Sequence, residues 1–228
     1  MPRSRLLPAL AVAAVLAAGV LAFQIVPSSA ESARVIAAPA VDEPAGQVPS
    51  EVAVLAGGCF WGVQGVFQHV DGVTSAVSGY AGGAKATADY NMVSTGSTGH
   101  AESVEIKFDP KKIRYGKILQ IFFSVAHDPT QLNRQGPDSG TQYRSAIFTS
   151  NETQQKIAEA SRDAFEPILA KAGYGHVTTA IVPLGEFYFA EDYHQQYLAK
   201  VPNGYCPNHA TGVKLPADFV VTPLQYVD

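Results

Sequence analysis

The chain has 228 residues, of which 46% are hydrophobic and 16% are charged, and its formal net charge at pH 7 is −4. This balance offers no basic surface to nucleic acid or to an anionic membrane, so we expect neither as a partner. No internal repeat or low-complexity block follows Ser50. The roughly 178 residues beyond that point suit one domain with a sizeable core.

The N-terminus has the features of an export signal. Two arginines precede an almost wholly apolar stretch over residues 6–26, and small residues occupy positions 28–30. This order predicts a signal peptide over residues 1–30, cleaved after Ala30. An uncleaved anchor over residues 6–26 is the alternative, because the stretch approaches the length that spans a bilayer. Both interpretations place the rest of the chain outside the cytoplasm, since the arginines remain inside.

Residues 31–50 are rich in alanine, proline, valine and small polar residues and have no clear period. Such a composition predicts a flexible linker. A single folded domain is then expected over residues 51–228.

Hydrophobic periodicity predicts an alternation of strands and helices in this domain. Strands are expected over residues 52–56, 73–80, 101–108, 145–149 and 177–183. Helices are expected over residues 60–68, 114–125, 152–172 and 190–199, the third of them capped by Asn151 and ended by Gly173. The elements do not form a strict βαβ series. This favours an α+β two-layer sandwich, with helices packed on one mixed sheet.

Cys59, one of only two cysteines, lies where a predicted strand ends and a predicted helix begins. The helix N-terminus stabilises a thiolate there and is expected to lower the pKa of the thiol. Gly57 and Gly58 allow a sharp turn, and Phe60 and Trp61 can form an apolar wall beside the sulfur. We therefore predict a nucleophilic or redox-active thiol. A buried structural cysteine is the alternative.

The second cysteine, Cys206, lies in a loop sequence with glycine, proline and asparagine neighbours. Two cysteines in an exported protein commonly form a permanent structural disulfide. An activated thiol and a second thiol on a loop are also the arrangement of an attacking and a resolving cysteine. Structural zinc through Cys206 and His209 is disfavoured, because two cysteines cannot complete a typical zinc site.

Five short motifs together resemble the peptide methionine sulfoxide reductase A family. They occur in that family's order between Glu51 and about Leu215, and they are Gly58–Gly62 (GCFWG), Gly79–Gly83 (GYAGG), Gly99–Glu102 (GHAE), Gly140–Ser145 (GTQYRS) and Glu191–Tyr197 (EDYHQQY). The resemblance implies reduction of the S epimer of methionine sulfoxide, free or within proteins. It also implies an α+β fold with a ferredoxin-like core.

The resemblance assigns the reacting groups. Cys59 corresponds to the nucleophile that attacks the sulfoxide sulfur and becomes a sulfenic acid. Glu102 corresponds to the acid that protonates the sulfoxide oxygen, so its carboxyl must stay protonated near pH 7, with a pKa raised by partial burial. Cys206 corresponds to the thiol that condenses with the sulfenic acid to form a Cys59–Cys206 disulfide.

The resemblance also assigns the substrate pocket. Phe60 and Trp61 correspond to residues that hold the substrate methyl group. Tyr80 and Tyr143 correspond to hydroxyls directed at the sulfoxide oxygen, and Asp138 to a residue that holds the substrate main chain.

A thioredoxin-like dithiol is the implied reductant. Some relatives carry a further recycling cysteine in the tail, but Thr211–Lys214 contains none here. The Cys59–Cys206 disulfide would therefore meet the reductant directly. Export implies a periplasmic enzyme that is supplied by a membrane-fed dithiol relay. We expect no cofactor, no resident metal and a monomer.

Two other functions remain possible at this stage. A thiol hydrolase or acyltransferase would use Cys59 with His100 or His194 as base. A non-catalytic exported domain would instead carry a fixed Cys59–Cys206 bridge.

Overall fold

A computed structural model describes residues 34–35, 41–43, 49–201, 204–205 and 213–214, all within the unit Glu31–Asp228. The predicted signal segment, most of the predicted linker and Cys206 lie outside the described residues.

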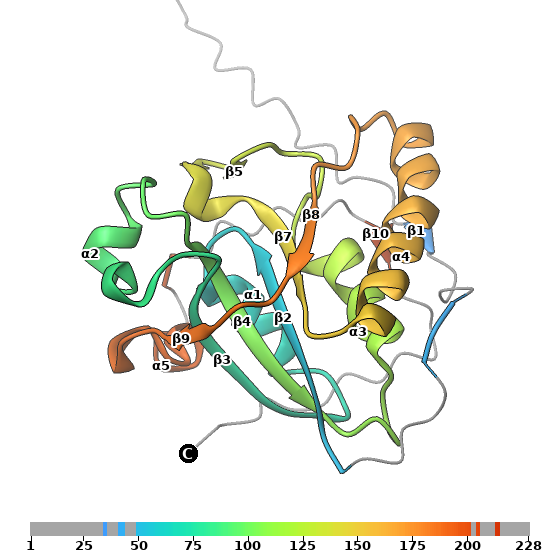
Figure 1. Cartoon of the computed structure of the whole chain (residues 1–228). Helices are drawn as coiled ribbons and strands as arrows, with labels where there is room; N and C mark the ends of the chain where they lie inside the picture. Colours follow the sequence, from blue (N-terminus) through green and yellow to red (C-terminus); the bar gives the residue numbers. More distant parts are fainter. Residues whose placement is uncertain (1–33, 36–40, 44–48, 202–203, 206–212, 215–228) are drawn as a thin grey trace, which may run out of the picture. The chain divides into compact units, whose positions relative to one another are not determined.

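The central element is a six-stranded mixed sheet (Figure 1). Its strands are β2 (Glu51–Gly57), β3 (Val73–Ala81), β4 (Ala101–Phe108), β7 (Ser145–Thr149), β8 (Ala180–Pro183) and β9 (Phe187–Phe189). They are arranged in the order β8-β7-β2-β4-β3-β9, where β7 and β8 are parallel and every other pair is antiparallel. The prediction of an α+β fold with a mixed sheet is confirmed.

The described residues also form helices and two short strand pairs outside this sheet. The helices are α1 (Phe60–Phe67), α2 (Tyr90–Val93), α3 (Tyr115–Ile121), which continues into a π-helical turn (Phe122–Ala126), α4 (Glu152–Lys171) and α5 (Tyr197–Lys200). Two short pairs complete the described strands: β1 (Arg34–Val35) with β10 (Val213–Lys214), and β5 (Arg134–Gln135) with β6 (Asp138–Ser139).

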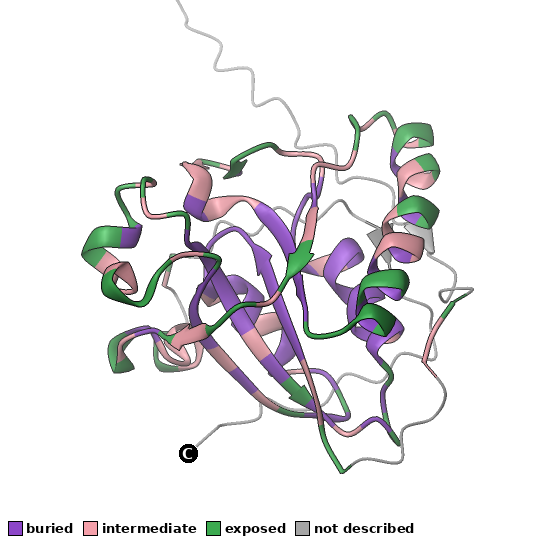
Figure 2. Ribbon diagram, in the orientation of Figure 1, coloured by how far each residue is buried: buried purple, intermediate pink, exposed green. Residues whose placement is uncertain are grey.

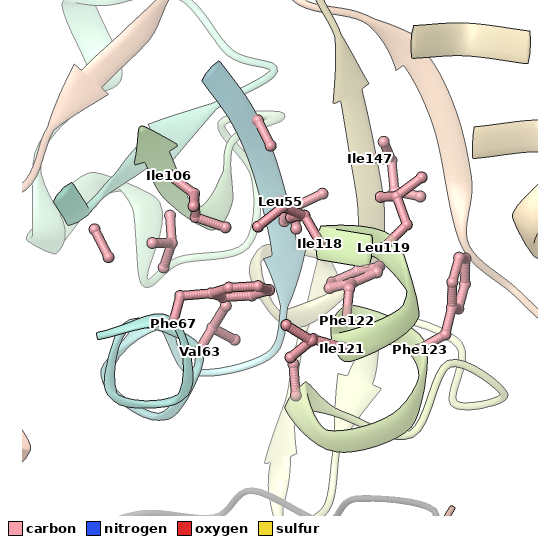
Figure 3. Close-up of a cluster of buried hydrophobic side chains, with 14 of the residues drawn as sticks. Leu55, Val63, Phe67, Ile106, Ile118, Leu119, Ile121, Phe122, Phe123 and Ile147 are labelled. Carbon is pink, nitrogen blue, oxygen red and sulfur yellow. The ribbon is translucent and has the colours of Figure 1, made fainter. Parts of the chain in front are cut away.

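Most residues of the central strands are buried (Figure 2), and the two faces of the sheet carry apolar clusters of unequal size. Alternate residues of the strands pack under α1, α3 and α4 in the larger cluster, where Leu55, Ile106 and Ile147 meet Phe67 and Phe122 (Figure 3). The opposite side chains form a smaller apolar cluster: Val54, Ala56, Ala81, Ala101, Ala146 and Phe148. Burying large aliphatic and aromatic groups at roughly 25 cal/mol per Å² makes the helix-covered face the main source of stability.

Most predicted elements are present within two residues of their expected bounds. Asn151 caps α4 by accepting a hydrogen bond from the Gln154 N–H at 2.9 Å, and Gly173 follows the helix with φ of 90°. The strand predicted over 177–183 begins only at Ala180. The helix predicted over 114–125 changes to a π-helical turn at Phe122. Helix α2 and strand β9 were not predicted.

The prediction of a helix over residues 190–199 is wrong. This stretch contains a 3₁₀ turn (Asp192–His194) and the single-turn helix α5. Gln196 between them has a left-handed conformation with φ of 55°, which interrupts any continuous helix. The Gln195 side chain supplies the reason, since its amide bonds to the backbone of β3.

Two residues of the predicted linker bond to the start of α3. Glu43 accepts a hydrogen bond from the Tyr115 N–H at 3.1 Å, and Asp42 accepts one from the Gly116 N–H at 2.9 Å. The Arg114 guanidinium lies 3.4 Å from the Asp42 carboxylate. The two carboxylates thus satisfy N–H groups that the first helical turn leaves unpaired, so this part of the predicted linker is attached to the fold.

Candidate active site

Cys59 lies between the end of β2 and the first turn of α1, as predicted. The turn depends on Gly58, which has φ of +96° and whose missing Cβ would lie 2.6 Å from the Gln135 side chain. Cys59 is a free thiol that is 6% exposed. Backbone N–H groups of Trp61 and Gly62 face the sulfur, which is the helix N-terminal environment expected from the sequence.

The predicted lowering of the Cys59 pKa is wrong for the substrate-free site. Burial raises the pKa of the thiol well above its usual range, and the charge of Glu102 adds to the rise. The N–H groups of Trp61 and Gly62 act in the opposite direction but are outweighed. In this site the sulfur is therefore a protonated thiol at neutral pH.

Glu102 brings a buried carboxyl to the start of α1. Its side chain is on the helix-covered face of β4, and one oxygen accepts a hydrogen bond from the Phe60 N–H at 3.0 Å. Desolvation raises the pKa of Glu102 to about 8, although the Phe60 N–H opposes the rise and Asp138 adds to it. The expected raised pKa is confirmed. Near neutral pH the group is an acid beside the Cys59 thiol.

Tyr80 is the residue of β3 directly opposite Glu102. The ring is fully buried, and its hydroxyl donates a hydrogen bond to Glu191 at 2.8 Å. Glu191 also accepts a hydrogen bond from the Tyr90 N–H at 2.9 Å. The Tyr80 hydroxyl therefore does not point freely into the site as the sequence analysis expected, because it has a partner in the C-terminal part of the chain.

An aromatic group covers the same end of the sheet. Trp61 stacks on Tyr197, with ring centroids 3.8 Å apart, and donates from its indole nitrogen to His194 Nδ1 at 3.1 Å. The Phe60 ring lies near the rings of Tyr80 and His194, at centroid distances of 5.8 and 4.9 Å. The predicted apolar wall of Phe60 and Trp61 therefore exists, and residues distant in sequence complete it.

Asp138 lies on β6, and Tyr143 lies in the 3₁₀ turn Thr141–Tyr143 that follows this strand. The charge of Asp138 raises the pKa values of Cys59 and Tyr143, although burial is the larger cause for both groups. Asp138 also accepts a hydrogen bond from the Tyr205 hydroxyl at 2.7 Å. The Arg144 guanidinium stabilises this region by donating hydrogen bonds to the carbonyl oxygens of Gly99, His100 and Thr141.

Side-chain amides hold the 191–196 segment against the sheet. Gln195 accepts from the Ser78 N–H at 2.9 Å and donates to the Ser78 and Ala190 carbonyl oxygens. It also accepts from the buried Gln64 amide at 3.2 Å, while Gln64 accepts from the Gln196 N–H at 2.7 Å. This network places Glu191 and His194 beside Tyr80 and Trp61.

Four residues at the site have no role predicted from the sequence: Glu191, Gln195, Tyr197 and Tyr205. The first three belong to the motif Glu191–Tyr197, and membership of this motif is the only sequence signal that places them near the site. Their separate roles depend on contacts with residues more than one hundred positions away.

The two histidines considered as bases, His100 and His194, already use their ring lone pairs as hydrogen-bond acceptors. His100 accepts from the Gly83 N–H and directs its second nitrogen to the Ala84 carbonyl oxygen at 3.0 Å. His194 accepts from Trp61 through Nδ1, so its Nε2 carries the proton. Neither ring keeps a free lone pair for the Cys59 proton, which counts against a thiol hydrolase.

Among the described residues, no group of three or more histidine, cysteine, aspartate or glutamate side chains is placed to hold a metal ion. None of the helices in that part of the chain combines the length and the apolar character needed to cross a membrane.

Comparisons with known proteins agree on one family. The family model described as "Peptide methionine sulfoxide reductase" matches residues 51–217. MsrA 2 of Mesorhizobium japonicum is 60% identical over 153 residues, which is 67% of this chain and 77% of that protein. MsrA of Salinispora arenicola is 49% identical over 207 residues, covering 86% of this chain and 94% of that protein.

Solved structures with this fold belong to the same group. Methionine sulfoxide reductase A of Corynebacterium diphtheriae gives a TM-score of 0.63 at 38% identity, covering 84% of this chain and 97% of that one. Mxr1 of Saccharomyces cerevisiae in its reduced form gives a TM-score of 0.66 at 33% identity, covering 73% of this chain and 95% of that one. The chain therefore belongs to the peptide methionine sulfoxide reductase A family, a group of oxidoreductases that act on sulfur.

Proposed function

We propose that this enzyme reduces the S epimer of methionine sulfoxide, free or in oxidised proteins, through Cys59. The observation that carries the proposal is the buried Glu102 carboxyl, whose pKa is raised to about 8 and which bonds to the N–H of the residue after Cys59. A carboxylic acid that stays protonated at neutral pH can donate a proton to a sulfoxide oxygen. The neighbouring thiol supplies the nucleophile.

In the first step the Cys59 sulfur attacks the sulfoxide sulfur while Glu102 protonates the oxygen. The substrate S–O bond breaks, an S–O bond forms on Cys59, and methionine leaves. The substrate sulfur gains two electrons and the cysteine sulfur loses two, which leaves Cys59 as a sulfenic acid. The thiol proton lost by Cys59 restores the acid form of Glu102.

Phe60 and Trp61 form the apolar wall that we assign to the substrate methyl group. Their burial against His194 and Tyr197 supports a fixed pocket at this position. We assign the substrate main chain to Asp138 and contacts with the sulfoxide oxygen to Tyr80 and Tyr143.

Cys206 is proposed to attack the sulfenic acid, releasing water and forming a disulfide with Cys59. The hydrogen bond between Tyr205 and Asp138 supports this step, because it brings the residue before Cys206 to the site. A thioredoxin-like dithiol then reduces the disulfide by thiol exchange.

We further propose an exported, periplasmic and monomeric enzyme, with residues 1–30 as the signal, 31–50 as the linker and 51–228 as the catalytic domain. An anchor over residues 6–26 remains the alternative to cleavage. The core is proposed to be ferredoxin-like. The strand order β7-β2-β4-β3, with α1 connecting β2 to β3 and α3 lying in the connection from β4 to β7, supports this topology.

The test is a single turnover with S-methionine sulfoxide and a probe that labels sulfenic acids. The wild-type protein should release methionine, and Cys59→Ser should release none, because a hydroxyl is a far weaker nucleophile at neutral pH. Methionine release by Cys59→Ser at the wild-type rate would refute the assignment. A persistent disulfide with no labelling would instead favour the fixed bridge.

Cys206→Ser separates the first step from the second. It should release one methionine per enzyme and then remain as a labelled Cys59 sulfenic acid, since no partner thiol can condense with it. Sustained turnover of this variant with thioredoxin would contradict the resolving role of Cys206.

A further inference from the structure

The side chain of Gln135 contacts the turn that carries Cys59. Although glutamine is polar, this residue is buried. A Cβ added at Gly58 would lie 2.6 Å from both Cβ and Cγ of Gln135, so the aliphatic part of the side chain packs directly on the Gly58 backbone. Because Cys59 is the next residue, the position of Gln135 limits where the thiol can lie.

The amide of Gln135 is held by the backbone of a single residue. Its Oε1 accepts a hydrogen bond from the Asp128 N–H at 3.0 Å, and its Nε2 donates to the Asp128 carbonyl oxygen at 2.9 Å. Two hydrogen bonds to one residue fix the direction of the amide. They therefore also fix the aliphatic part of the side chain that meets Gly58.

One loop, over residues 127–135, covers both glycines that precede Cys59. A Cβ added at Gly57 would lie 3.0 Å from the His127 ring, just as one added at Gly58 would meet Gln135. His127 directly precedes Asp128, the residue that holds the Gln135 amide. The two contacts with the glycines thus belong to a single loop that the Gln135 amide closes.

The backbone of Gln135 connects this loop to Asp138. Gln135 on β5 and Asp138 on β6 are register partners in the short antiparallel pair. The charge of Asp138 contributes to the raised pKa of Cys59, so the carboxylate lies close enough to act on the thiol. Gln135 therefore contacts Gly58 through its side chain and pairs with Asp138 through its backbone.

We infer that Gln135 is a positioning residue that sets the spacing between Cys59 and Asp138. The inference rests on the proposed function, in which Asp138 holds the substrate main chain while Cys59 attacks the sulfoxide sulfur. Both groups act on one substrate molecule, so their separation must match the span from its main chain to its sulfoxide. A misplacement of about 1 Å can slow a reaction by about 10²-fold.

Gln135→Met tests the amide without removing the aliphatic contact. The variant side chain keeps the Cβ and Cγ atoms that meet Gly58, but it cannot form either bond to Asp128. In single turnovers the limiting rate of methionine release should fall by roughly 10-fold, while the sulfoxide concentration that gives half this rate should change by less than about 2-fold. Both groups can still bind the substrate, but no longer at the productive separation.

Gln154→Met is the matched control for a loss of stability. Gln154 is also buried, and its amide accepts from the Ser150 N–H at 3.0 Å and donates to the Val52 carbonyl oxygen at 2.9 Å. Val52 lies near the opposite end of β2 from Cys59. Both variants lose two amide–backbone bonds, so urea unfolding should show similar losses of unfolding free energy. Only Gln135→Met should slow methionine release.

A double-mutant cycle with Asp138→Ala tests whether Gln135 and Asp138 act together. Asp138→Ala removes the group that holds the substrate main chain, so the spacing between that group and Cys59 no longer matters. Gln135→Met should then slow methionine release by about 2-fold or less in the Asp138→Ala background, against roughly 10-fold in the wild-type background.

Three results would overturn the inference. They are an unchanged limiting rate in Gln135→Met, an equal loss with and without the Asp138 side chain, and an equal slowing in Gln154→Met, which would assign the effect to lost stability. Failure of the proposed function is recognised separately, because the wild type would then release no methionine.

Gln131→Met provides the same test if Gln135→Met does not fold. The half-buried Gln131 amide closes the same loop, by donating to the Asp128 carboxylate at 3.0 Å and accepting from the Gly136 N–H at 2.8 Å. This variant should also slow methionine release, and again only while the Asp138 side chain is present. An unchanged rate in Gln131→Met would contradict the inference.

Discussion

Tyr80 and Glu102 lie on sheet strands, whereas Glu191 and His194 lie in the 191–196 segment, which has only one 3₁₀ turn. Strand pairing positions the first pair, since Tyr80 is the register partner of both Glu102 on β4 and Tyr188 on β9. Side-chain amides position the second pair, chiefly those of Gln64 and Gln195. The positions of Tyr80 and Glu102 therefore depend on strand pairing in the sheet. The positions of Glu191 and His194 depend instead on a few side-chain hydrogen bonds.

The largest expected effect on the reaction rate comes from replacing Glu102, the carboxyl on β4. Glu102→Gln keeps the size of the side chain and can still accept from the Phe60 N–H, so the fold should persist. The first turnover should slow by roughly 10²–10⁴-fold, the usual contribution of a general acid. Single-turnover methionine release measures this, with circular dichroism as the control. Unchanged kinetics from pH 5 to 9 would mean that another group supplies the proton.

The same carboxyl should make the protein less stable as the pH rises. The pKa of Glu102 is about 8 in the folded state and near 4.5 when unfolded, so between these values only the folded state holds the proton. The free energy of unfolding should therefore fall as the pH rises from about 4.5 to about 8. Urea unfolding across this range measures the slope, which should be shallower in Glu102→Gln. Equal slopes would show that the carboxyl is solvated.

The contribution of the 191–196 segment can be tested by replacing Gln195. Gln195→Leu leaves the buried Ser78 N–H without its partner, at a cost of roughly 1–3 kcal/mol. It also removes one hydrogen bond each from the Ser78 carbonyl oxygen and the Gln64 amide, which keep their bonds to Ala190 and Ala76. The segment should loosen, so KM for the sulfoxide should rise more than kcat falls. Gln155→Leu is the matched control, since Gln155 bonds only to exposed Glu159 on α4. A loss confined to kcat would indicate direct participation in the chemistry.

The smallest effect is expected away from both parts of the site. Asn151→Ala removes the cap of α4 and should lower the free energy of unfolding by about 1 kcal/mol without changing turnover. Asn151→Asp keeps an accepting oxygen and should recover most of that loss. Urea midpoints and steady-state rates measure both. A change in turnover would show that α4 influences the site.

The sequence predicted the elements whose periodicity is strong. Alternation identified β4, and the Asn151 cap and Gly173 identified both ends of α4. The position of Cys59 at a strand-to-helix junction could also be predicted, because paired glycines mark the turn. These features depend on residues that are close together in the chain.

Where the sequence predictions differ from the structure, the cause is contacts between residues far apart in the chain. The helical pattern over 190–199 is broken by the bonds of Gln195 to β3, which no local pattern contains. Burial raises the pKa of Cys59, and burial is a property of the whole fold rather than of the helix start. The attachment of Asp42 and Glu43 to α3 likewise joins segments about seventy residues apart.

Trp61 is the only tryptophan in the chain, and it touches both parts of the site. It belongs to α1 beside Cys59, while its stacking partner Tyr197 and its hydrogen-bond acceptor His194 come from the C-terminal part. Indole fluorescence responds both to stacking and to hydrogen bonding. The emission of Trp61 therefore reports on the contacts between α1 and the C-terminal part of the domain. Stopped-flow fluorescence of the unlabelled protein can therefore follow, in real time, how these contacts of Trp61 change when methionine sulfoxide is added.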